Sequence, residues 1–190
     1  SMKNTTSLLT RNLGSPDAAD AVIFTHMHSD HCSYYPLRVL SKSSMKLMVH
    51  QACVPALREK HCSNGLFDKL DLQTFSDRAF QVARLHIEPF EVRHQPGYRT
   101  CGFSIGYRTA GCWKKLVIAS DLNDGRALPD RFADADFIYI ESNHDLELLR
   151  LRPNPNSRFH MSNPATAAML CETRQKSRAV PQAVMLGHLS

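Results

Sequence analysis

The chain has 190 residues, 43% of them hydrophobic, and a formal net charge of +5. A chain of this size can bury one substantial core, so we expect a single domain over residues 1–190, in which Ser1 and Met2 are a cloning remnant. The sequence has no apolar stretch near the roughly 20 residues of a membrane helix and no charged-then-apolar secretory leader. These features argue against a membrane partner and favour a cytoplasmic protein.

The six cysteines form no CxxC pair, so we expect reduced thiols, several of them buried. Cys32 adjoins a histidine cluster, but we expect its side chain to pack rather than to bind metal. The positive charge fits an anionic partner, such as a phosphodiester, and a solvated basic surface equally well.

Apolar runs that suit strands alternate with helical patterns along the chain. Residues 3–20 are polar and predict a helix end followed by a loop. We predict strands at 21–25, 46–50, 85–93, 100–108, 115–120, 136–140 and 183–186, and helices at 34–41, 54–60, 145–151 and 164–175. Strands 85–93 and 100–108 follow each other through Pro96 and Gly97, so hairpin-like pairs interrupt the alternation. This mixture favours layered sheets with helices outside over a doubly wound sheet.

Four side chains that can bind a metal lie within the segment His26-Met27-His28-Ser29-Asp30-His31, directly after the first predicted strand. An extended backbone sends alternate side chains to one face, so His26 and His28 can converge on one ion. The following turn would bring Asp30 and His31 toward a second ion. Imidazole and carboxylate ligands suit zinc, manganese or iron better than calcium or magnesium alone.

Three further donors each follow an apolar strand. His94 follows the strand that ends near Arg93, Asp121 follows Ser120, and His188 follows Ala183-Val-Met-Leu-Gly187. Each one alone is more often a cap or a turn residue. Their repetition at strand ends, however, is typical of a site that several strands assemble.

The order of these motifs resembles the metallo-β-lactamase superfamily: HxHxDH, then a histidine, then Ser-Asp, then Gly-His-Leu-Ser. The resemblance implies an α/β fold of four layers, the αββα sandwich. Within that superfamily, Ile140-Glu-Ser-Asn-His-Asp145 is similar to the WalJ/YycJ-type bacterial nucleases. Phe159-His-Met-Ser-Asn163 resembles a second histidine motif shared by that branch and ribonuclease Z. The likeness runs from about residue 21 to the C-terminus.

The resemblance implies a role for each donor. One metal would be held by His26, His28 and His94, the other by Asp30, His31 and His188, with Asp121 as the bridge. The implied cofactors are two divalent ions, zinc or manganese first, with iron as an alternative. His160 would face the scissile phosphate, and its alternative is a structural or helix-capping role.

Three residues of the nuclease-like segment are candidates for contacting substrate or orienting a ligand: Glu141, Asn143 and His144. A structural salt bridge is the alternative for Glu141, and a cap on the helix near Asp145 is the alternative for His144.

The sequence departs from this family pattern at both ends. Such nucleases usually begin with paired strands and a Gly/Ser/Asn-rich loop, and they continue past the last histidine with a turn and a helix. We therefore expect a fold without its usual N-terminal strands and C-terminal tail, leaving an exposed sheet edge. In addition, Gln95 follows His94 where relatives often have Asp, which weakens an outer hydrogen bond to a ligand without removing the metal.

The expected activity is cleavage of a phosphodiester by a hydroxide held between two metals, since a bound cation lowers the pKa of water to roughly 7. Asp30 or Asp121 would orient this hydroxide, and His160 would bond the phosphate or protonate the leaving oxygen. Basic and aromatic side chains are candidates for contacting phosphates and bases, namely Arg150, Arg152, Arg158, Lys114, Lys115, Trp113, Tyr98 and Tyr107. A solvated charged face, or a place in the core for the aromatics, is the alternative for each.

Other functions fit parts of the same pattern. A hydrolase of a small ester, thioester, lactone or cyclic phosphodiester would use the same metals. A di-iron oxidoreductase usually has Glu where this chain has His28, which argues against that class. A metal- or nucleic-acid-binding module without catalysis is a third alternative, made less favourable by the complete donor set. The choice of DNA or RNA, of exo- or endonuclease, and the oligomeric state stay open.

Overall fold

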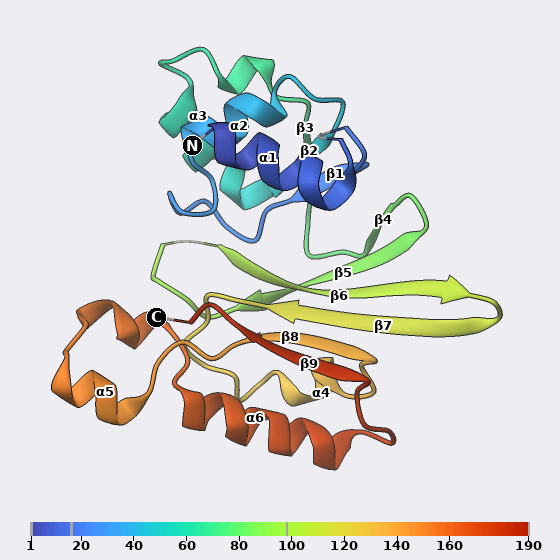
Figure 1. The fold of residues 1–190 in the computed structure, drawn as a ribbon, viewed down its shortest axis with the longest axis vertical. Helices are drawn as coiled ribbons and strands as arrows, with labels where there is room; N and C mark the ends of the chain where they lie inside the picture. The colour runs from blue at the N-terminus through green and yellow to red at the C-terminus, as the bar shows by residue number, and fades with distance from the viewer. Residues whose placement is uncertain (1, 16, 98, 190) are drawn as a thin grey trace. The chain divides into compact units, whose positions relative to one another are not determined.

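The computed structural model describes residues 2–15, 17–97 and 99–189 (Figure 1). The chain divides into two compact units, residues 1–78 and residues 79–190, and each is described by itself. The expectation of one domain over the whole chain stays a prediction. No helix in the described ranges is both long and apolar enough to cross a membrane.

The first unit is built on a three-stranded parallel sheet in the order β1-β2-β3. Its strands are β1 (Ala21–Ile23), β2 (Lys46–His50) and β3 (Leu72–Phe75), and its helices are α1 (Met2–Leu13), α2 (Tyr34–Leu40) and α3 (Val54–His61), with 3₁₀ turns η1 (Gln51–Cys53) and η2 (Phe67–Lys69). The apolar run in β2 is buried because β2 is the central strand, and it packs with Leu37 and Leu57 from the helices.

The second unit is built on a six-stranded sheet in the order β4-β5-β6-β7-β8-β9. Its strands are β4 (Phe80–Val82), β5 (Leu85–Val92), β6 (Thr100–Thr109), β7 (Cys112–Ala119), β8 (Phe137–Glu141) and β9 (Ala183–Gly187). Strands β4 to β7 are antiparallel, and β7, β8 and β9 are parallel. The carboxyl ends of β7, β8 and β9 therefore lie at one edge of the sheet, where polar side chains can meet.

The described part of the second unit also contains helices. They are α4 (Pro129–Phe132), α5 (Leu146–Leu151) and α6 (Asn163–Lys176), with a 3₁₀ turn η3 (Pro155–Phe159), and α6 runs along the sheet in Figure 1. The core between sheet and helices contains Phe90, Val117, Ile138, Phe132 and Met169, all nearly inaccessible to solvent. Burying each such side chain contributes about 1.5–3 kcal/mol, so this core holds the strand ends in place.

The mixed α/β architecture with two sheets and helices agrees with the predicted fold class. Every predicted strand and helix is present, with shifts of a few residues at their ends. Strands β3 and β4 and helix α4 were not predicted, because each is at most four residues long and carries too few turns of periodic pattern. The described residues ahead of β1 form helix α1 and turns rather than a strand, and β1 lies at the edge of its sheet.

Candidate metal centre

The histidine segment forms a loop directly after β1 in the first unit. The amides of His31 and Cys32 donate hydrogen bonds to the His28 carbonyl at 3.2 and 2.8 Å, which closes a turn. His26 Nε2 lies 2.9 Å from His28 Nδ1, and the His26 and His31 rings are 4.3 Å apart. Because zinc binds imidazole nitrogen at roughly 2.0–2.1 Å, two nitrogens of one ion lie roughly 3 Å apart, and this pair fits.

Cys32 follows the histidine segment, and its side chain packs into the core of the first unit. Cys32 is nearly inaccessible, and burial raises the pKa of its thiol to about 11. The predicted packing of this side chain in the hydrophobic core is thereby confirmed. Asp30, in contrast, is exposed, and one of its oxygens lies 3.6 Å from His31 Nε2.

The second unit brings the three predicted strand-end donors together. His94 follows β5, Asp121 follows β7, and His188 follows β9 directly. Asp121 Oδ1 lies 3.2 Å from His188 Nε2 and 4.0 Å from His94 Nε2. One carboxylate between two imidazoles is an arrangement that suits a divalent cation such as zinc, so the donor set fits a metal.

The backbone at two of these donors is in the left-handed region. Asp121 has φ +58° and His188 has φ +53°, a conformation that non-glycine residues rarely adopt. Gly187, just before His188, lies against the Tyr139 side chain, where an added Cβ would be 2.1 Å from the hydroxyl oxygen. Unusual backbone of this kind concentrates at functional sites, where the surrounding fold holds it in place.

Glu141, at the end of β8, forms hydrogen bonds with two of the imidazoles. Its Oε1 accepts hydrogen bonds from His160 Nδ1 at 2.6 Å and from His188 Nδ1 at 3.1 Å, and its Oε2 accepts from the Leu122 amide at 2.7 Å. Full burial works to raise the pKa of this carboxyl, but the hydrogen bonds outweigh burial, and the pKa lies below its ordinary value. Glu141 is thus a buried carboxyl that contacts two of the predicted site imidazoles, and its role there stays a prediction.

His94 is fixed by a different partner. Its Nδ1 donates to the Phe159 carbonyl at 3.0 Å, which directs the Nε2 lone pair toward Asp121. Burial lowers the pKa of the His94 imidazole despite the opposing influence of the Phe159 carbonyl and Asp121, so the neutral, ligating form is favoured. The Ser120 hydroxyl in turn donates to Asp121 Oδ2 at 2.8 Å.

Comparison with known proteins identifies this architecture. A family model described as the Beta-lactamase superfamily domain matches residues 3–182. The chain belongs to this superfamily. It is 30% identical over 211 residues to Exodeoxyribonuclease WalJ of two Streptococcus pneumoniae strains, covering 99% of this chain and 70% of that protein. The resemblance stated from the motifs is thereby confirmed.

Solved structures show the same fold. The metallo-beta-lactamase fold protein YhfI from Bacillus subtilis matches with a TM-score of 0.69 and 17% identity, over 96% of this chain and 69% of that one. The short form of human tRNase Z matches with a TM-score of 0.67 and 13% identity, over 97% and 78% of the two chains. At these identities the likeness establishes the metallo-β-lactamase fold and nothing finer.

The remaining predicted residues of this superfamily member take distinct places. Asn143 Nδ2 donates to the His188 carbonyl at 2.7 Å and so helps to hold that strand end. His144 pairs with Ser162 through a backbone bridge, while Asp145 itself caps α5 by accepting from the amides of Glu147 and Leu148. The capping alternative for His144 is therefore wrong. His160 lies 5.1 Å from His94 and 4.9 Å from His188, ring centre to ring centre.

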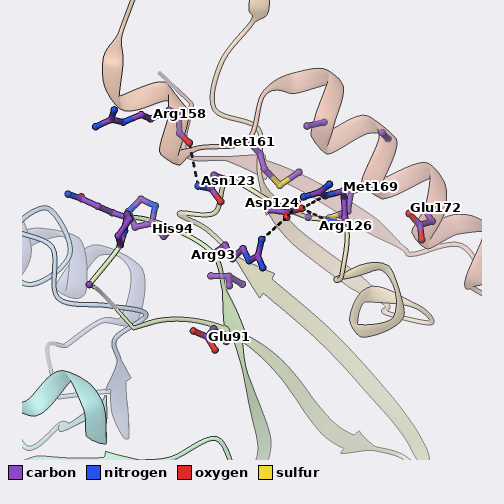
Figure 2. Close-up of a pocket in the computed structure, with 17 residues that line it drawn as sticks. Glu91, Arg93, His94, Asn123, Asp124, Arg126, Arg158, Met161, Met169 and Glu172 are labelled. Carbon is purple, nitrogen blue, oxygen red and sulfur yellow. Dashed lines mark hydrogen bonds and ion pairs between the residues drawn. The ribbon is translucent and has the colours of Figure 1, made fainter.

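A cavity of about 800 Å³ opens beside His94 (Figure 2). Three arginines from three segments line it, namely Arg93, Arg126 and Arg158. Asp124 pairs with Arg93 at 3.5 Å and with Arg126 at 2.8 Å, whereas Arg158 lies over the Phe159 ring at 4.6 Å. Sequence reasoning found only Arg158, because the other two flank no recognisable motif and meet only in the fold.

The other predicted basic and aromatic groups lie elsewhere in the second unit. Lys114 pairs with Asp136 at 2.6 Å, and Lys115 Nζ donates to the Ala133 carbonyl at 2.7 Å, so both serve the fold. Arg152 lines a separate cavity beside α5, and Arg150 lies on α5 itself. Trp113 and Tyr107 are exposed rather than core, and Tyr98 lies outside the described residues.

Proposed function

We propose that this superfamily member is a metal-dependent phosphodiesterase that cleaves nucleic acid. The observation that carries the proposal is the hydrogen bond of 2.6 Å from His160 to the buried Glu141, beside the strand-end donors. It places an oriented imidazole next to residues that suit a metal. The 30% identity to an exodeoxyribonuclease over nearly the whole chain supports the same choice.

In this proposal the seven predicted donors would hold two divalent cations. By the family pattern, His26, His28 and His94 would hold one cation, Asp30, His31 and His188 would hold the other, and Asp121 would serve both. Bound cations of this kind lower the pKa of water to roughly 7 and stabilise charge that develops on phosphate oxygens. Zinc and manganese suit the donors best, and iron is an alternative.

The protein's own groups then orient and move protons. Glu141 accepts a hydrogen bond from His160 Nδ1, which leaves Nε2 as the His160 nitrogen available to substrate. With the ring in its imidazolium form, Nε2 would donate a hydrogen bond to a phosphate oxygen or give its proton to the leaving oxygen, which leaves the neutral imidazole. Ser120 fixes one oxygen of Asp121, which leaves the other for the centre.

Among the described residues that line this cavity, Arg158 is the cation that suits a phosphate, because the other two arginines pair with Asp124 and two further carboxylates line the same cavity. Arg158 keeps its guanidinium on the Phe159 ring, next to the carbonyl that holds His94. A phosphate bound by Arg158 would therefore lie beside the candidate metal centre, with Arg93 and Arg126 further along the cavity in Figure 2. Contacts of this kind make binding fall with salt, as expected for a nuclease.

Digestion of end-labelled oligonucleotides tests the proposal. Single- and double-stranded DNA and RNA are incubated with manganese, zinc or a chelator, and product lengths separate stepwise removal of nucleotides from internal cleavage. We expect metal-dependent cleavage that His160→Ala lowers by roughly 10²–10⁴-fold, the usual share of a proton-transfer group. The control is Gln175→Ala, an exposed residue of α6 outside the candidate metal centre.

Parallel reactions with small substrates distinguish the proposed phosphodiesterase from the alternative functions. Bis-p-nitrophenyl phosphate, a lactone and a thioester are compared under the same metals. Turnover of the lactone or thioester without any phosphodiester would make the protein a small-ester hydrolase and overturn the proposal. Metal bound at two equivalents with no turnover of any of these compounds would make it a binding module, which also overturns the proposal.

A further inference from the structure

The only tryptophan of the chain lies flat on a glycine, far from the candidate metal centre within the second unit. Trp113 is on β7 and Gly106 is on β6, and a Cβ added at Gly106 would be 2.0 Å from the indole Cζ2. Because Gly106 has no Cβ, the indole ring can pack against β6 at this position. The indole is nonetheless 55% exposed and belongs to neither hydrophobic core.

The indole borders a small polar cavity of about 290 Å³ between the sheet and α4. Around it are a hydroxyl, an imidazole and an ion pair, which come from Ser104, His86 and Glu88 with Arg131. Arg131 donates to Glu88 at 3.1 Å, and the His86 ring centre is 6.4 Å from that of Trp113. The cavity thus joins one large aromatic surface to several hydrogen-bonding groups, as a site for a flat heterocycle requires.

Charge around this cavity favours an anionic chain. The nearby carboxylates each have a cationic partner: Glu88 with Arg131, Asp130 with Lys176, and Asp136 with Lys114. Arg108 is paired with Trp113 in the strand register, so both side chains leave the same face of the sheet. In the described chain no ion pair involves Arg108 or Arg84 of the β4–β5 turn, which leaves positive charge at this end.

We propose that Trp113 stacks an unpaired base of single-stranded nucleic acid at a second site, remote from the cleavage site. The choice of nucleic acid as the ligand of this second site rests on the proposed function. Trp113 lies six residues before the end of β7, about 20 Å along the strand from the segment that carries Asp121. A strand bound at both places would need several nucleotides between them, so this site favours longer single strands.

Because the chain has one tryptophan, its fluorescence reports this site directly. Chelator-treated protein is titrated with single-stranded (dT)₂₀ and a duplex of equal length, while fluorescence anisotropy of labelled oligonucleotide measures total binding. We expect (dT)₂₀ to quench the tryptophan emission in step with the anisotropy and the duplex to have little effect.

Three variants separate stacking from general attraction. Trp113→Ala is expected to weaken (dT)₂₀ binding by roughly 10-fold, the range of one base–aromatic stack, and Trp113→Phe to restore part of it. Gly106→Ala keeps the tryptophan but displaces the ring, so it is expected to shift the emission and weaken binding together. Tyr107→Ala is the matched control, since Tyr107 is an exposed aromatic on β6 whose side chain leaves the opposite face of the sheet from Trp113.

The outcomes distinguish this inference from the proposed function. Oligonucleotide binding with unchanged tryptophan emission, and with equal affinity in Trp113→Ala, overturns the stacking site alone. Quenching without metal-dependent cleavage supports the stacking site while the proposed function fails. No anisotropy change with any strand overturns both.

Discussion

The two donor sets of this chain are built in different ways. In the first unit four donors are neighbours in sequence and lie on one loop after β1. In the second unit the donors come from the ends of three strands, and each has an outer partner: Phe159 for His94, Ser120 for Asp121, and Glu141 with Asn143 for His188. The loop set also has such a contact, between the Thr25 hydroxyl and His26 Nδ1 at 3.0 Å, but that partner is a neighbour in sequence. The partners of His94 and His188, in contrast, come from other elements.

This difference indicates a division of labour. Outer hydrogen bonds fix the tautomer and direction of an imidazole, so the strand-end set is arranged before any metal arrives. The loop set contains His26 and His28 nitrogens 2.9 Å apart, which a shared cation would hold together. We therefore expect metal to organise the loop more than the strand ends.

Replacing the two aspartates one at a time gives the largest contrast. Asp121→Ala is expected to lower turnover by at least about 10³-fold and to lower the bound metal, because it removes a buried donor between two imidazoles. It is also expected to lower the free energy of unfolding by about 1–2 kcal/mol, since the Ser120 hydroxyl loses its acceptor.

Asp30→Ala tests the other side of that comparison. Asp30 is exposed, so its loss is expected to leave the denaturation midpoint of the chelated protein unchanged. Asp68→Ala, also exposed, is the control for both variants. Equal destabilisation by Asp30→Ala and Asp121→Ala, or unchanged turnover in Asp121→Ala, would contradict the division.

Glu141→Gln tests the outer hydrogen bonds of the strand-end set. The amide keeps the size of the side chain but brings an NH₂ group toward donors that now bind an ionised carboxylate. We expect a loss of about 10–100-fold in metal affinity or turnover, measured by metal titration and by kinetics. Glu147→Gln on α5 is the control, and an equal effect of both variants would speak against an orienting role.

Amide exchange with and without chelator tests the loop set. The His31 and Cys32 amides depend on the His28 carbonyl, whereas the Leu122 amide depends on Glu141. Chelation is expected to raise exchange at His31 and Cys32 by roughly 10-fold or more, as local opening becomes easier, and to leave Leu122 protected. A uniform rise at all three amides would show that metal organises both sets alike.

Arg158→Ala tests whether the cavity beside His94 binds phosphate. Loss of one phosphate contact is expected to weaken oligonucleotide binding a few-fold and to reduce the slope of log K against log salt by about 0.7–0.9. Titrations at several salt concentrations measure it. Arg38→Ala in α2 of the first unit is the control. An unchanged slope would remove Arg158 from the interface.

Asp124 gives the smallest expected effect. Hydrogen bonds from Arg126 lower the pKa of its carboxyl from 3.8 to about 2, so the ion pair stabilises the fold above the ordinary pKa and is lost as pH falls toward 2. Asp124→Asn is expected to lower the free energy of unfolding by only about 1 kcal/mol at pH 6, because the arginines are largely exposed. The difference is expected to shrink progressively below pH 4, as Asp124 of the unsubstituted protein becomes protonated. Urea denaturation at pH 6 and at a pH below 4 measures this difference. A difference that does not change with pH would contradict the expected pH dependence.

The loop set and the strand-end set also differ in how far the sequence predicted them. His26 to His31 can be identified directly, because a contiguous motif needs no tertiary information. His94, Asp121 and His188 followed from the pattern of apolar strand and polar end. The hydrogen bond from His160 to Glu141 joins residues 19 apart on different elements, and only the packing of β8 against η3 and α6 creates it.

Other parts of the structure could not be predicted for the same reason. The arginine pairs around Asp124 depend on two turns meeting, and turns carry little periodic signal. The short strands β3 and β4 are defined by their neighbours rather than by their own residues. The place of Trp113 on Gly106 depends on cross-strand register, which side-chain alternation alone does not determine.

The contact between Gly187 and the Tyr139 hydroxyl sets a limit on how this fold can change by mutation. A larger residue at 187 would require either the Tyr139 ring to move or β9 to shift from β8, and a shift of β9 would carry the adjoining imidazole with it. A displacement of 1 Å at a reacting centre can cost about 10²-fold in rate. The spacing between β8 and β9 thereby sets the position of a predicted metal ligand. We expect substitutions at Tyr139 and Gly187 to lower activity more than they lower the free energy of unfolding.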